Sequence, residues 1–164
     1  MNVDLSKIVT HQQIYIDSCI PSAVEMILKL NSRVDEDYYS LQVEQYRKLH
    51  IENNLDNEKY RSFDYLNDQE YYRLKFTKFS NQPAEELFQK IDKEINEDRY
   101  VIISLRNQNS FGFHMWIIYG YNKVNNDYLN FSKRYCSSDL ICFDYLKDHV
   151  RYMGKTDILT YKFV

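Results

Sequence analysis

The chain has 164 residues and a formal net charge of −3, with 16 tyrosines and 9 phenylalanines but only three glycines and two prolines. This length predicts a single domain over residues 1–164 with a substantial core. The charge balance gives no electrostatic footprint for nucleic acid or an anionic membrane surface, so we expect neither as a partner. No run approaches the ~20 apolar residues that span a bilayer.

Three cysteines, Cys19, Cys136 and Cys142, occur in the chain. The first thirteen residues lack the apolar stretch and small-residue cleavage site of a secretory signal. An odd number of cysteines without such a signal argues against a disulfide framework. We therefore expect a cytoplasmic protein, with export that needs no cleaved signal as the alternative.

The segment from Gln13 to Leu30 is the most informative stretch of the first half. Its pattern predicts a helix that begins at Cys19, because Pro21 suits a first turn, where a missing N–H costs nothing. The apolar residues that follow at helical spacing predict a face buried on at least one side.

The next elements are less regular. Residues 36–49 predict a helix. Residues 50–70 are polar, and a short helix is expected near Phe63. The sequence does not decide whether this polar segment forms a lid. Residues 71–79 alternate as a strand does. Pro83 then opens a predicted amphipathic helix whose apolar residues, Leu87, Ile91 and Ile95, recur every four positions.

The last third reads mainly as strands. Continuous apolar runs at residues 100–105 and 113–121 predict buried strands, and the turn at 122–127 predicts a hairpin with a partner strand at 128–131. A short helix over 140–150 and a final strand over 157–164 complete the expected order. Helices followed by an antiparallel sheet predict an α+β fold.

Cys19 is the candidate nucleophile. The N–H groups and positive dipole end of a helix favour the thiolate, which is the reactive form of cysteine. The competing interpretation is an inert core cysteine, since free cysteines are among the most buried residues.

His114 is the candidate base because it opens a hydrophobic strand between Gly112 and Gly120, whereas the other three histidines are most simply surface side chains. Asn130 on the partner strand could orient the imidazole, with Asp127 in the turn as its rival. Gln13, just before the cysteine, could donate to an oxyanion.

This order and spacing resembles papain-like cysteine peptidases, and more narrowly the small bacterial peptidases that remove double-glycine leaders from bacteriocins. The resemblance rests on the step from Gln13 to Cys19, the strand HMWIIYGY that opens at His114, and the step from there to Asn130. It implies a papain-like fold in which N-terminal helices pack on a C-terminal antiparallel sheet. It also implies Cys19 as nucleophile, His114 as base and acid, Asn130 as orienting residue and Gln13 as oxyanion donor.

Three positions depart from the narrower family: Ile20 replaces a glycine, Asn130 replaces an aspartate, and Phe131-Ser132 stands where Asp-Pro or Ser-Trp is usual. The predicted activity is thiol-dependent hydrolysis of a peptide or isopeptide bond in a peptide or protein substrate. The alternatives are transglutaminase- or deamidase-type acyl transfer on the same fold and a catalytically inactive interaction domain.

No cofactor or metal is expected from the sequence. Cys136, Cys142 and His149 do not have zinc-site spacing, and no glycine-rich phosphate loop occurs. The oligomeric state is left open.

Overall fold

The computed structural model describes residues 3–52, 55–108 and 110–164. Its α-helices and strands are α1 (Cys19–Leu30), α2 (Ser40–Tyr46), β1 (Glu70–Tyr71), β2 (Leu74–Pro83), α3 (Ala84–Asn96), β3 (Val101–Arg106), β4 (Phe113–Asn122), β5 (Asp127–Lys133), β6 (Leu140–Ile141), α4 (Leu146–Met153) and β7 (Lys155–Phe163). The strands form one sheet in the order β1-β2-β7-β3-β4-β5-β6, and every neighbouring pair is antiparallel.

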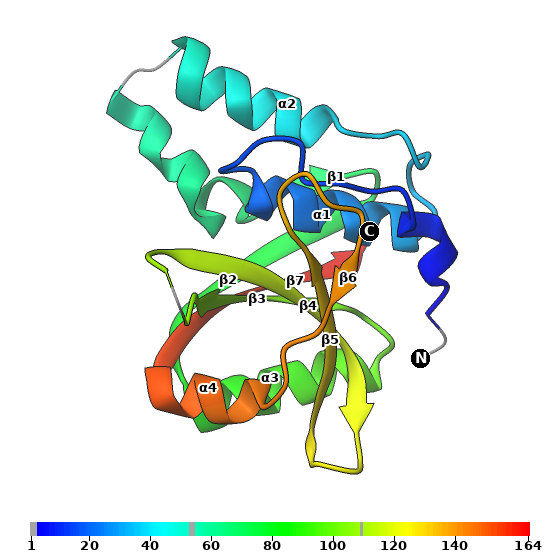
Figure 1. Cartoon of the computed structure of the whole chain (residues 1–164), viewed down its shortest axis with the longest axis vertical. Helices are drawn as coiled ribbons and strands as arrows, with labels where there is room; N and C mark the ends of the chain where they lie inside the picture. The colour runs from blue at the N-terminus through cyan, green and yellow to red at the C-terminus, as the bar shows by residue number, and fades with distance from the viewer. Residues whose placement is uncertain (1–2, 53–54, 109) are drawn as a thin grey trace.

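Helices lie on both faces of the sheet (Figure 1), and an apolar cluster fills the space on each face. On one face, α1 packs through residues such as Val24, Ile27 and Leu28 against Phe76, Ile102 and Ile117. On the other face, α3 and α4 cover the sheet with residues such as Leu87, Ile91 and Val150. Alternate residues of a strand point to opposite faces, so β3 and β4 contribute to both layers, which is why their sequences are continuously apolar. The architecture is α+β, as predicted.

Several predicted elements are confirmed, including the start of α1 at Cys19 and the helix after Pro83. The helix expected over 36–49 divides into α2 and a π-helical turn, Arg47–Glu52. In the segment 50–70, the short helix expected near Phe63 is a 3₁₀ turn, Phe63–Leu66, preceded by another at Leu55–Arg61.

Two predictions about element type were wrong. The single strand expected over 71–79 is interrupted at Tyr72 and Arg73, whose positive φ angles of 51° and 70° turn the chain between β1 and β2. The helix expected over 140–150 begins only at Leu146, because residues 140–141 pair with the end of β5 instead. In the described part of the chain, no helix is both long and apolar enough to cross a bilayer.

Candidate active site

Cys19 is the first residue of α1, and the residue as a whole is partly exposed. The preceding residue, Ser18, makes no side-chain cap. Its hydroxyl lies 2.6 Å from Oε1 of Gln42 and 3.0 Å from the carbonyl oxygen of Tyr15. Pro21 has no N–H, and the N–H of Ser22 donates to the carbonyl oxygen of Ser18 at 2.9 Å, so the N–H groups of Cys19 and Ile20 are the ones in the first turn that can donate to an anion.

The surroundings of Cys19 favour the thiol over the thiolate. Burial raises the pKa of Cys19 to about 11, and the negative charge of Asp17 acts in the same direction. Hydrogen bonds from the backbone N–H groups of Cys19 and Ile20 oppose this shift but do not overcome it. These surroundings favour the protonated form of Cys19 in the free protein.

His114 lies near the start of β4, with Nε2 2.6 Å from Oγ of Ser132. The Ser132 hydroxyl also donates to the carbonyl oxygen of Met115 at 2.7 Å. A hydroxyl has one hydrogen, so Ser132 must accept from Nε2–H of His114. This contact fixes the tautomer that leaves Nδ1 with its lone pair, the form a general base requires.

The imidazole is neutral for two reasons. Burial lowers the pKa of His114 to about 4, and the positive charge of Arg134 adds to the effect. The ring also packs edge-on against Trp116, with centroids 5.6 Å apart. Together with the protonated Cys19, this gives a neutral thiol–imidazole pair near pH 7.

Cys19 and His114 line the same pocket, although 95 positions separate them in the chain. Gln13, Trp116 and Arg134 line this pocket as well. The tip of α1 supplies the sulfur, and the sheet supplies the imidazole. The structure thus brings together three of the four site residues that the sequence predicted.

Gln13 is buried, and its amide is already engaged. Nε2 donates to the carbonyl oxygens of Tyr15 at 2.8 Å and Ile16 at 3.0 Å. Its backbone carbonyl accepts from the N–H of Cys136 at 3.0 Å, which ties the loop before α1 to the segment after β5. Both amide hydrogens are used, so Gln13 can donate to an oxyanion only if one of these bonds opens.

The structure does not bring Asn130 to His114. Asn130 Oδ1 accepts from the N–H of Phe143 at 2.8 Å, and Nδ2 donates to the carbonyls of Phe143 and Tyr128 at 3.0 and 3.1 Å. The predicted orienting role is corrected here: Asn130 fixes the segment before α4, and Ser132 holds the imidazole.

A β-bulge explains why sequence reasoning missed Ser132. The β4–β5 hairpin pairs Gly120 with Leu129 but Ile118 with Asn130, so β4 carries one extra residue at Tyr119. Had the register continued unbroken, Ser132 would pair with Ile117 and point to the face opposite His114. The one hint of this bulge in the sequence is the glycine at position 120. A Cβ added there would lie 3.4 Å from Leu129 Cδ1, so β5 approaches the backbone closely at this point.

His11 is completely buried under α1, so its assignment as a surface histidine was wrong. Nζ of Lys29 lies 2.8 Å from Nδ1 of His11, and Nε2 lies 2.9 Å from Oγ of Ser22. Burial and the nearby positive charges of Lys29 and Lys133 lower the pKa of His11 to about 2. This histidine is a neutral structural link between the N-terminal segment and α1.

Gln42 of α2 holds the loop before Cys19 in place. Its Oε1 accepts from the N–H of Ile14 at 2.8 Å and from Ser18, and its Nε2 donates to the carbonyl of Gln12 at 3.0 Å. The same Nε2 lies 2.7 Å from a carboxylate oxygen of Glu25. Burial raises the pKa of Glu25 to about 7, although its hydrogen bonds oppose the shift. No pattern in the sequence predicts this network.

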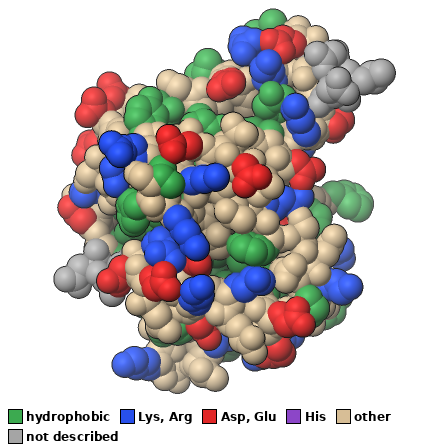
Figure 2. Space-filling model, turned by 180° about the vertical axis from the view of Figure 1, so that it is seen from behind, with side chains coloured by type: hydrophobic (Ala, Val, Ile, Leu, Met, Phe, Trp, Pro, Cys, Tyr) green, Lys and Arg blue, Asp and Glu red, His purple; other side chains and the backbone are tan. Residues whose placement is uncertain are grey.

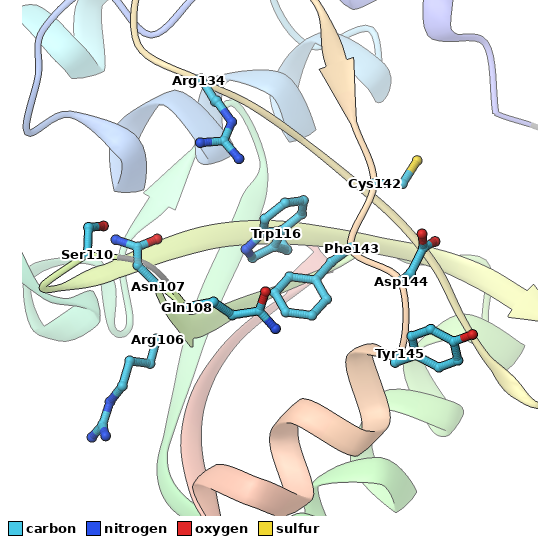
Figure 3. Close-up of a pocket in the computed structure, with 10 residues that line it drawn as sticks. All are labelled: Arg106, Asn107, Gln108, Ser110, Trp116, Arg134, Cys142, Phe143, Asp144 and Tyr145. Carbon is cyan, nitrogen blue, oxygen red and sulfur yellow. The ribbon is translucent and has the colours of Figure 1, made fainter.

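Two further pockets continue the site on either side. One shares Cys19 and is lined also by Arg61, Phe63 and Met115, so part of the segment 50–70 borders the thiol. The other shares Trp116 and Arg134 and extends toward Phe143 and Tyr145 (Figure 3). Within the described ranges, no three His, Cys, Asp or Glu side chains gather as a metal site would require.

Comparison with known proteins identifies a family. A family model described as the Peptidase_C39 like family matches residues 4–139, a range that includes Gln13, Cys19, His114 and Ser132. No curated protein matches the chain. The family indicates a papain-like peptidase fold and suggests cysteine peptidase activity. Because the match covers more than half of the sequence, this chain belongs to the Peptidase_C39 like family.

Proposed function

We propose that this protein is a thiol-dependent hydrolase that cleaves a peptide or isopeptide bond with Cys19 as nucleophile and His114 as base and acid. One observation carries the proposal. The sulfur and the imidazole line one pocket, and Ser132 holds the tautomer of His114 whose Nδ1 can accept a proton.

In the first half of the reaction, the Cys19 sulfur attacks the amide carbonyl carbon while its proton passes to Nδ1 of His114. The backbone N–H of Cys19 stabilises the oxyanion, and Nε2 of Gln13 joins once it releases Tyr15 or Ile16. The tetrahedral intermediate then collapses. The C–N bond breaks, His114 returns its proton to the leaving amine, and a thioester remains.

In the second half, water attacks the thioester and gives a proton to His114. The C–S bond breaks, the acid is released, and the proton returns to the sulfur. Because the resting pair is neutral, proton transfer accompanies attack, as in serine hydrolases, rather than preceding it.

The test uses an electrophilic peptide inhibitor of cysteine peptidases, with the modified residue mapped by mass spectrometry. We expect modification of Cys19, abolished in Cys19→Ala and strongly slowed in His114→Ala, with circular dichroism unchanged. Cys142→Ser is the matched control, since Cys142 is an exposed free cysteine. Modification of Cys19 at the same rate with and without His114 would refute the proposal.

One observation favours a second candidate, a catalytically inactive interaction domain. The partner of His114 is a neutral hydroxyl, and burial disfavours the charged forms of both Cys19 and His114. Under this candidate, substitution of Ser132 or His114 leaves the reactivity of Cys19 unchanged. Ammonia release from glutamine side chains without backbone cleavage would instead indicate deamidase-type or transglutaminase-type chemistry.

The narrower resemblance to bacteriocin-leader peptidases is part of the same proposal and is supported only by the motif spacing around Cys19 and His114. Cleavage of a double-glycine leader peptide tests this resemblance directly. The cytoplasmic location likewise stays a prediction.

A further inference from the structure

Arg134 is a cation in the pocket that Cys19 and His114 share, and it is common to two pockets. It lines the pocket of Cys19 and His114 and the adjoining pocket floored by Trp116 and Phe143. Trp116 and Phe143 meet edge to face, with centroids 5.2 Å apart, and give the second pocket an apolar wall.

No carboxylate pairs with Arg134 among the residues that the structure describes, in contrast to Arg61, which lies 3.1 Å from Asp17 in another pocket that Cys19 lines. Figure 3 shows the guanidinium of Arg134 on one side of the Trp116–Phe143 pair and the one carboxylate of this pocket, Asp144, on the other. Arg106, by comparison, points away from the aromatic pair and lies over the Phe113 ring, 5.9 Å from its centroid.

Neutral hydrogen-bonding groups complete the wall beside Arg134. Asn107 and Ser110 line both pockets that Arg134 lines, and Figure 3 shows them on the same side of Trp116. Guanidinium, amide and hydroxyl groups are the donors that recognise a carboxylate. On the face that Figure 2 shows, acidic and basic side chains are interspersed.

We propose that Arg134 is a specificity-determining residue that binds a carboxylate of the substrate, an acidic side chain or a C-terminal carboxylate, next to the bond that Cys19 attacks. This inference rests on the proposed function and names its substrate class. A bound carboxylate would also offset the positive charge that Arg134 places near His114, which makes the imidazole a better base once substrate is bound.

The experiment compares alkylation of Cys19 by iodoacetate and by iodoacetamide, two reagents with the same leaving group but different charge. The rate at Cys19 is followed by mass spectrometry of its peptide. The ratio of the two rates cancels any change in the thiol pKa. We expect Arg134→Gln to lower the iodoacetate-to-iodoacetamide ratio about two- to fivefold, the range for an exposed charge pair.

The controls separate charge from folding. Arg134→Lys retains the charge and should keep most of the ratio. Arg151→Gln removes a cation that pairs with Glu85 on α3, away from these pockets, and should leave the ratio unchanged. An unchanged ratio in folded Arg134→Gln, or the same fall in Arg151→Gln, overturns the inference.

Failure of the proposed function gives a different result from failure of the inference about Arg134. If neither reagent modifies Cys19, the hydrolase proposal fails, and binding of a small carboxylate to the pocket then tests the role of Arg134. The chain contains one tryptophan, so the indole resonance of Trp116 reports on this pocket alone. In Cys19→Ala, N-acetylglutamate α-amide, which has only a side-chain carboxylate, or N-acetylglutamine, which has only a C-terminal carboxylate, should shift that resonance, and Arg134→Gln should abolish the shift. N-acetylglutamine α-amide, which has no carboxylate, should not shift it. Equal shifts with all three compounds overturn the inference.

Discussion

Nε2 of His114 and Oγ of Ser132 lie 2.6 Å apart, and the serine hydroxyl donates its only hydrogen to the carbonyl oxygen of Met115. The imidazole is therefore oriented by a neutral acceptor rather than by a carboxylate. Such an acceptor fixes the tautomer but gives little stabilisation to an imidazolium.

The first prediction concerns Ser132. Ser132→Ala removes the acceptor that holds Nε2–H, and we expect kcat to fall about 10- to 100-fold, the equivalent of losing one buried hydrogen bond in the transition state. Single-turnover acylation by a peptide ester measures this change. Asn130→Ala is the matched control on the same strand face. It should lower the thermal midpoint through loss of its bonds to Phe143 while acylation is slowed far less. Equal effects of both variants on acylation would contradict the assignment.

The second prediction is the pH dependence of Cys19 alkylation. With the pKa of the thiol raised to about 11 and that of His114 lowered to about 4, the neutral pair dominates between these values. The thiolate fraction then rises about tenfold per pH unit below pH 11, so the iodoacetamide rate should climb steadily from pH 6 to 10. A plateau beginning near pH 5 would instead reveal a thiolate–imidazolium pair.

The third prediction separates two roles of Gln13. Because both Nε2 hydrogens hold loop carbonyls, we expect Gln13→Ala to lower the free energy of unfolding by about 1–3 kcal/mol as well as to slow acylation. Urea denaturation measures the first effect and acylation kinetics the second. A loss of about 10²–10³ in kcat with full stability would show a pure oxyanion donor. Gln12→Ala serves as the neighbouring control, since the structure shows only its backbone in the loop contacts.

The fourth prediction uses the buried His11. Its pKa in the folded state, about 2, lies below the ordinary value of 6.5, so the unfolded chain binds more protons between these values. Stability contributed by the neutral ring is present above pH 6.5 and is lost as the pH falls. Relative to His11→Phe, the protein should lose about 2 kcal/mol between pH 6.5 and 5. Urea denaturation at both pH values measures this difference.

Glu25 provides the control of opposite sign. Its pKa is raised from 4.5 to about 7, so the folded state binds the extra proton between those values and is stabilised as the pH falls. Glu25→Gln should therefore remove a stabilising trend on acidification, whereas His11→Phe removes a destabilising one. The same sign for both variants would contradict these assignments.

The sequence by itself determined the features that depend on local pattern. The start of α1 at Cys19, the amphipathic α3 and the buried strands β3 and β4 follow from helix-start chemistry, periodicity and β-branched runs, which act over a few residues. Those signals also selected Cys19, His114 and Gln13, which share a pocket, and the family to which the chain belongs.

Only the tertiary structure decided the contacts that depend on strand register and on packing between distant segments. One extra residue at Tyr119 placed the β5 side chains Asn130 and Ser132 on the same face as His114. Asn130 pairs with Ile118, four residues along β4 from His114, so Ser132, nearer along the strand, contacts the imidazole. His11 is buried because the N-terminal segment packs against α1. Gln42 of α2 forms hydrogen bonds with the loop before Cys19 because that loop packs against α2. Such contacts produce no periodic pattern in the sequence. The residues they join are far apart in the chain, and the number of residues between them follows from the fold rather than from the repeat of a helix or strand.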